Sequence, residues 1–193
     1  MKKIEMGKKP YLLPMPIILA GATIKGKANY MPVAFCGVLQ NNPAMIGIAI
    51  GPSHYTNKAI KETQGFSVNI PSTKSLEVTD YCGIVSGTKI DKEKLFSNFY
   101  GILEKVPMIE ECPVNLECRL VSAINLGGSH ELFIGEVVQS YINEDCLNDG
   151  KTNIKEIDPI LYLFDKNEYI NTGDFVGKAY RAGKDYMMKQ GTE

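Results

Sequence analysis

The chain has 193 residues, of which 44% are hydrophobic and 22% are charged, so it is long enough and apolar enough to bury a core. Its formal net charge is −1 and it has no strongly basic run, which argues against a partner made of nucleic acid or an anionic membrane surface. No stretch of about twenty apolar residues is present, so we expect no transmembrane helix.

The first third of the sequence predicts short strands separated by turns. Apolar runs over residues 17–24, 30–39 and 45–50 are bounded by Gly, Asn or Pro, as strands commonly are. The apolar stretch 11–22, with lysines before it, loosely resembles a signal peptide. Two prolines within it would break the helix that such a peptide forms, so we expect it to stay in the folded protein.

A helix and a fourth strand follow the third strand. Thr56 is placed to cap a helix over residues 57–64, and Gly65 is placed for the left-handed conformation that often ends a helix. Residues 66–70 predict a strand, and residues 72–83 predict a second helix after a Ser-Thr cap.

The most regular pattern in the sequence is a pair of long strands. Residues 114–126 alternate between apolar and polar positions, a Gly-Gly-Ser turn follows, and residues 130–142 alternate again. This pattern predicts a long antiparallel hairpin. Shorter elements complete the prediction, namely strands over 160–164 and 168–170 and a helix within 178–190.

These elements predict a mainly β fold, a mostly antiparallel β-barrel with short helices. The sequence has no β-α-β alternation, no G-x-G-x-x-G and no P-loop, so a dinucleotide-binding fold is not expected. The cysteines contain no C-x-x-C pair and only two histidines accompany them, so we expect no metal site and a reducing, cytoplasmic setting. The cysteines are Cys36, Cys82, Cys112, Cys118 and Cys146.

One loop has the residue types of an anion site. Ser53 and Thr56 flank His54-Tyr55 directly before a predicted helix, whose first N–H groups have no partner inside the helix. Those N–H groups and the two hydroxyls can hold a phosphate. The same hydroxyls can equally serve only as helix caps.

A set of short motifs stands in a characteristic order over residues 10–164. In chain order they are Pro14-x-Pro16, Gly26-x-x-Asn29, Asn42-Pro43, Ser53-x-Tyr55-Thr56, Phe66-Ser-Val-Asn69, Cys82-Gly-Ile-Val-Ser-Gly87, Asp91-Lys92, Glu111-Cys-Pro-Val-Asn-Leu-Glu-Cys118, Gly128-Ser-His130 and Gly135-Glu136. Together they resemble the flavin reductase-like domain family, and in particular its flavoredoxin branch. Each motif is weak alone, but their combined order and spacing are specific.

The resemblance implies one domain over residues 1–193, with a core over 10–170 and a helical tail over 175–193. It implies an FMN-binding split β-barrel that forms a homodimer, with FMN at the subunit interface. The residues that the resemblance assigns to the flavin ring are Asn29, Met31, Ala34, Phe35 and Cys36. Those it assigns to the phosphate are Ser53, Tyr55, Thr56 and, as the cation, Lys92. His130 and Phe164 complete the site, from the same chain or from the partner subunit.

Three functions remain open from the sequence. The first is an oxidoreductase that passes electrons from NAD(P)H through FMN to free flavin, iron or another acceptor, with no catalytic side chain because the flavin carries the chemistry. The second is a non-catalytic electron carrier between redox partner proteins. The third is a related barrel that holds pyridoxal phosphate or haem, with His54 and His130 as axial ligands to the haem. Residue statistics alone would make Lys92 and His130 surface residues and the two phenylalanines core residues.

Overall fold

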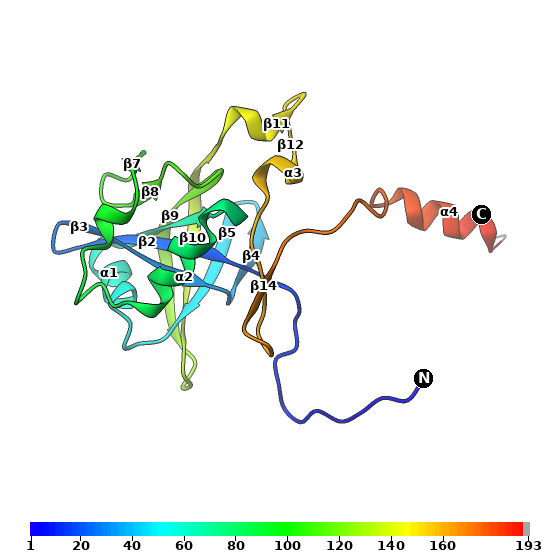
Figure 1. The fold of residues 1–193 in the computed structure, drawn as a ribbon, viewed down its shortest axis with the longest axis horizontal. Helices are drawn as coiled ribbons and strands as arrows, with labels where there is room; N and C mark the ends of the chain where they lie inside the picture. The colour runs from blue at the N-terminus through cyan, green and yellow to red at the C-terminus, as the bar shows by residue number, and fades with distance from the viewer. Residues whose placement is uncertain (191–193) are drawn as a thin grey trace.

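The computed structural model describes residues 1–190, and its central element is one curved antiparallel sheet of seven strands (Figure 1). The strand order is β3-β2-β6-β9-β10-β5-β4. Among the described residues no hydrogen-bonded ladder joins the two edge strands, so the sheet stays open between them. The bounds are β2 (Ile18–Ile24), β3 (Lys27–Val33), β4 (Cys36–Asn41), β5 (Ala44–Ile50), β6 (Gly65–Ile70), β9 (Val114–Asn125) and β10 (Glu131–Ile142).

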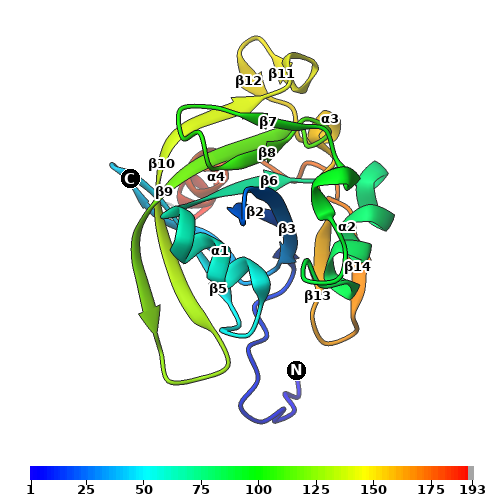
Figure 2. The same ribbon diagram turned by 90° about the vertical axis from the view of Figure 1, so that its left-hand side faces the viewer.

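Two helices cover the sheet beside β3, and Figure 2 shows them on either side of that strand. They are α1 (Tyr55–Thr63) and α2 (Leu76–Ile84), with a 3₁₀ turn, η1 (Thr73–Ser75), leading into α2. The remaining elements are β1 (Met15–Pro16), η2 (Lys92–Leu95), β7 (Asn98–Tyr100), β8 (Pro107–Ile109), η3 (Glu144–Cys146), β11 (Leu147–Asn148), β12 (Lys151–Thr152), α3 (Ile154–Ile157), β13 (Leu161–Leu163), β14 (Glu168–Ile170) and α4 (Arg181–Lys189).

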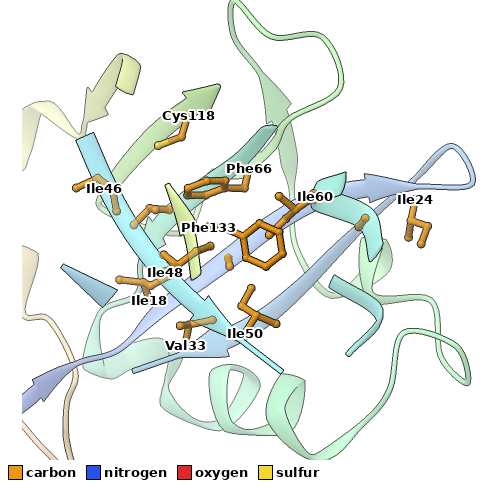
Figure 3. Close-up of a cluster of buried hydrophobic side chains, with 14 residues drawn as sticks. Ile18, Ile24, Val33, Ile46, Ile48, Ile50, Ile60, Phe66, Cys118 and Phe133 are labelled. Carbon is orange, nitrogen blue, oxygen red and sulfur yellow. The ribbon is translucent and has the colours of Figure 1, made fainter. Parts of the chain in front are cut away.

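One apolar cluster fills the inside of the curved sheet (Figure 3). Phe66 of β6 and Phe133 of β10 are fully buried there, and Ile60 of α1 closes the cluster from the helix side. Burying a side chain of this size contributes roughly 1.5–3 kcal/mol, so the cluster fixes α1 firmly against the sheet. The first turn of that helix is therefore held in a constant position.

A second cluster lies on the opposite face of β3, under α2. Leu19, Tyr30 and Ile109 are fully buried in it, and Cys82 of α2 packs against them. Residues 28 and 30 of β3 point into this cluster, while residues 29, 31 and 33 point to the other face, because side chains alternate along a strand. The pleat thus places Asn29, Met31 and Val33 on one face of β3 and the core residues Ala28 and Tyr30 on the other.

The long hairpin and the mainly β fold predicted from the sequence are confirmed. β9 and β10 pair antiparallel along their length, with two register shifts that leave Val121 of β9 and Val138 of β10 without a partner in this ladder. The short C-terminal strands are also present as β13 and β14, and the second helix is present as η1 and α2. No described helix has both the length and the apolar character needed to span a membrane.

The predicted strand over 30–39 is wrong in one respect, because it is broken in the middle. The N–H of Cys36 donates to the carbonyl of Ala34 (3.0 Å), which closes a tight three-residue turn. The chain then resumes as β4 and pairs with β5. The break leaves Ala34 and Phe35 outside both strands, where their side chains are free to face a cavity.

The predicted ends of the first helix are also wrong. α1 begins at Tyr55 after His54, so Thr56 lies inside the helix and does not cap it. At the other end, Gln64 and not Gly65 adopts the left-handed conformation (φ 55°). Gly65 begins β6 instead, and a Cβ there would lie 2.8 Å from the Val106 side chain. Glycine is needed at this position for space rather than for its backbone freedom.

The C-terminal helix is shorter than predicted. α4 covers Arg181–Lys189 within the predicted range 178–190, and residues 191–193 of the predicted tail lie outside the described part of the chain. Its helix and the segment before it extend away from the body, on the side from which the N-terminal segment also leaves (Figure 1).

Candidate functional site

Two adjoining hollows lie beside β3, and they share Met31 and His54 in their walls. The first, which we call the polar hollow, has a volume of about 260 Å³ and lies between β3, the start of α1 and the segment after α2. The second, the aromatic hollow, has a volume of about 200 Å³ and lies at the end of β3. Because they share two wall residues, the hollows form one groove of the size that takes a small molecule.

The start of α1 forms one wall of the polar hollow. The helix has no side-chain cap, so the first backbone N–H groups remain available to a ligand. Ser53, Tyr55 and Thr56, which the family resemblance assigns to a phosphate, all line the hollow. The positive end of the helix dipole adds a favourable field for an anion at this point.

Lys92 places a buried charged group in the wall of the polar hollow. Only 4% of the residue is exposed, and its Nζ donates to the carbonyls of Tyr30 (2.9 Å) and Cys82 (2.7 Å). Burial lowers the pKa of the ammonium group. No carboxylate of the described residues pairs with it. A buried cation without an anion is costly, so an anionic ligand would stabilise this position.

Asn29 supplies a second unsatisfied group in the same wall. Its Nδ2 donates to Oγ1 of Thr56 at 2.8 Å, which orients the amide. Its Oδ1 is buried, and no described residue donates a hydrogen bond to it. A buried carbonyl of this kind favours a ligand that brings a hydroxyl group.

The aromatic hollow is built from rings of three separate segments. Phe35 packs edge-on against His130, with 5.1 Å between ring centroids, and lies 6.0 Å from the ring of Phe164. Met31 and Ala34 line the same hollow. All of these side chains come from one chain, so His130 and Phe164 reach the groove without a partner subunit. A hollow with these walls suits a flat, largely apolar ligand.

Cys36 is the one predicted site residue that the structure does not place in the groove. It lines a different apolar hollow, between the turn at Ala34 and the N-terminal segment around Pro14, and its Sγ lies 3.9 Å from the carbonyl of Val33. Burial raises the pKa of this thiol to about 11. Cys36 is therefore a neutral thiol at physiological pH.

We expect Cys36 to react very slowly with iodoacetamide at pH 7, because the thiolate is the reacting form. The alkylation rate should rise about tenfold for each pH unit and level off only near the raised pKa. Mass spectrometry of the peptide that contains Cys36, sampled over time between pH 7 and 10, measures this rate. A rate that levels off near pH 8.5, as for an ordinary thiol, would contradict the assignment.

Sequence reasoning missed two parts of the groove. Residues 83–87, the end of α2 and the segment after it, line the polar hollow, and His54 lines both hollows. The motif Cys82-Gly-Ile-Val-Ser-Gly87 carried the signal for the first part, but only the fold shows that this segment returns to Asn29. The sequence indicated His54 only as a possible haem ligand and not as a wall of the flavin groove, because a lone histidine in a loop is most often a surface residue.

Comparison with known proteins gives one family and several structures. Residues 10–170 match the model of the flavin reductase like domain. A crystal structure of flavoredoxin from Methanosarcina acetivorans is 42% identical, with a TM-score of 0.93 over 97% of this chain and 100% of that chain. Flavoredoxin of Desulfovibrio vulgaris (Miyazaki F) is 30% identical, with a TM-score of 0.88 over 94% of this chain and 100% of that chain.

A more distant relative has a named activity. It is an NADPH-flavin oxidoreductase of Streptomyces viridifaciens, which is 24% identical over 127 residues, or 65% of this chain and 66% of the relative. The structural likenesses confirm the predicted split-barrel fold.

Proposed function

Because the chain belongs to the flavin reductase-like domain family, and to its flavoredoxin branch, we propose that it binds FMN in the joined hollows and serves as a redox flavoprotein. The observation that carries this proposal is Lys92, a buried ammonium group without a carboxylate partner among the described residues, set in the wall of the polar hollow. A phosphate is the natural anion for that position.

The polar hollow fits the phosphate and the chain of hydroxyl groups that joins it to the flavin ring. Lys92 and the first N–H groups of α1 would hold the phosphate, with Ser53 beside them. The unpartnered Oδ1 of Asn29 would accept a hydrogen bond from a hydroxyl group of the ligand. Thr56 keeps the Asn29 amide oriented for that contact.

The aromatic hollow fits the flavin ring. Phe35, His130 and Phe164 would contact the ring, and Met31 lies where the two hollows meet. Bound FMN supplies the electron transfer itself. The chain's own residues bind the two ends, orient the ring and exclude water from it, so the proposal needs no acid–base or nucleophilic side chain.

The electron donor that we propose is NAD(P)H, and the acceptor is free flavin, iron or another small oxidant. The distant likeness to an NADPH-flavin oxidoreductase supports this assignment. The higher identity to two flavoredoxins favours the second candidate, an electron carrier that is reduced and oxidised by protein partners. We further propose a homodimer with FMN at the subunit interface, in a reducing compartment such as the cytoplasm. The five free thiols support that compartment.

We expect the purified protein to have the absorption spectrum of a flavoprotein and to release FMN on denaturation. Release of another flavin, or the spectrum of haem or pyridoxal phosphate, would contradict the proposed cofactor. Mixing the FMN-loaded protein with NADH or NADPH without oxygen, and following loss of the flavin colour, separates the two roles. Rapid bleaching supports the oxidoreductase, whereas bleaching only by a reduced partner protein supports the carrier.

A further inference from the structure

The C-terminal arm, residues 171–190, has almost no contact with the body of its own chain. Lys155 reaches the carbonyl of Gly173 and the carboxylate of Asp174, each at 3.5 Å. Beyond that point α4 has no buried residue. In Figure 1 the arm extends well clear of the sheet. Its apolar side chains are exposed, including Phe175 (77%), Val176 (100%) and Tyr180 (90%).

The exposed surface of the chain is larger than that of a compact monomer of the same mass. The chain exposes 12413 Å², whereas a compact monomer of its mass, 21.3 kDa, exposes about 9,100 Å². The excess is thus on the order of 3,000 Å². Obligate homodimers hide roughly 2,000–5,000 Å² in total, so the excess is sufficient for one partner's share of such an interface.

The partner that the observations favour for the arm is a second copy of this chain. The likeness to the Methanosarcina acetivorans flavoredoxin covers 97% of the chain at a TM-score of 0.93, and the uncovered 3% is shorter than the arm. Most of the arm therefore has a counterpart in a separate protein of the same fold. A segment with so few contacts to its own body, present in two proteins of the same fold, is well explained by a neighbour that always accompanies it, and a second copy of the chain is such a neighbour.

The body carries apolar surface on the side from which the arm leaves. β4 is an edge strand, and its Val38 (75%) and Leu39 (52%) are exposed. Leu12 of the N-terminal segment is exposed as well, and that segment leaves on the same side (Figure 1). An exposed apolar edge strand invites pairing or association unless another segment covers it.

We propose that the C-terminal arm of each copy crosses to the other copy and covers its exposed surface around β4, with Phe175, Val176 and Tyr180 as the apolar contacts. Two-fold symmetry makes the exchange reciprocal, because each copy gives one arm and receives one. The inference rests on the homodimer of the proposed function and names the segment that holds it together. It does not require a bound flavin.

The test measures self-association by sedimentation equilibrium for four chains: the full chain, a chain ended after Thr172, Val176→Ser/Tyr180→Ser, and the control Lys178→Ser/Lys184→Ser. We expect the full chain and the control to be dimers. The truncated chain and the apolar variant should dissociate, with dimer dissociation constants raised at least roughly 10–100-fold. Circular dichroism should show the same folded body in all four, since the arm buries nothing of its own chain.

Equal dissociation constants in the four chains, or a monomeric full chain, would overturn the inference. A full chain that instead binds phospholipid vesicles or a different protein through the arm would do the same. FMN content is measured in the same samples, so that failure of the proposed FMN-binding function can be distinguished from failure of the proposed arm exchange. A dimer that depends on the arm but holds no FMN rejects only the proposed function, and an FMN-loaded dimer that ignores the arm rejects only this inference.

Discussion

Replacing Lys92 with methionine should raise the dissociation constant for FMN by roughly 10–100-fold and leave that for riboflavin nearly unchanged. The two ligands differ only in the phosphate, and Lys92 is the buried cation that we assign to it. Titration of flavin-stripped protein with each ligand, by calorimetry or by quenching of flavin fluorescence, measures both constants. An equal rise in both dissociation constants would show that Lys92 does not contact the phosphate.

The same substitution should also lower the free energy of unfolding. Methionine removes the donor of two buried carbonyls, those of Tyr30 and Cys82, and an unsatisfied buried group costs roughly 1–3 kcal/mol. Lys89→Met is the matched control, because Lys89 is an exposed lysine of the same segment. We expect the control to change neither stability nor FMN affinity by a comparable amount.

Adding one methyl group at residue 87 should also disrupt flavin binding. A Cβ at Gly87 would overlap the Oδ1 of Asn29 and lie 2.9 Å from the Tyr55 ring. Both side chains line the polar hollow, so Gly87→Ala must displace at least one of them. Overpacking of this kind typically costs 1–3 kcal/mol. We expect the dissociation constant for FMN to rise roughly tenfold or more, in line with one lost buried hydrogen bond.

Riboflavin distinguishes this variant from the lysine variant. Asn29 is assigned to the hydroxyl groups that both ligands share. Gly87→Ala should therefore raise the dissociation constants for FMN and for riboflavin by a similar factor. Gly128→Ala is the control, because a Cβ there would meet no atom within 4 Å and its φ is not in the left-handed range. If Gly87→Ala binds FMN as tightly as the control, Asn29 does not contact the ligand.

The parts of the fold that local pattern determines were predictable. The hairpin of β9 and β10 follows from alternation over residues 114–142, and turn residues marked most of the N-terminal strands. β7, β8, β11, β12 and α3 were not predicted, since they are short and lack a regular pattern. Their formation depends on contacts with distant strands, such as the hydrogen bond from Ser67 of β6 to the carbonyl of Pro107.

In the candidate site, too, some features follow from local sequence and others depend on distant contacts. Residue types around Ser53 indicated an anion site, and the family resemblance named most of the groove. The contacts of Thr56 and Lys92 could not be predicted from the neighbouring residues, because their hydrogen-bond partners are far away in the sequence. Asn29, 27 residues earlier, engages the hydroxyl that was expected to cap α1. The carbonyl of Tyr30 holds a lysine that residue statistics would place on the surface.

Strand β3 has a consequence for which molecules can enter the groove at all. Asn29, Met31 and Val33 follow one another on a single face, from the anion end to the ring end, and successive strand residues are about 3.3 Å apart. Because β3 is paired with β2 along its whole length, this spacing is rigid. For the proposed FMN site, we therefore expect the groove to select ligands by the distance between their charged end and their planar end. Changes to the planar end alone should be tolerated better than changes to that distance.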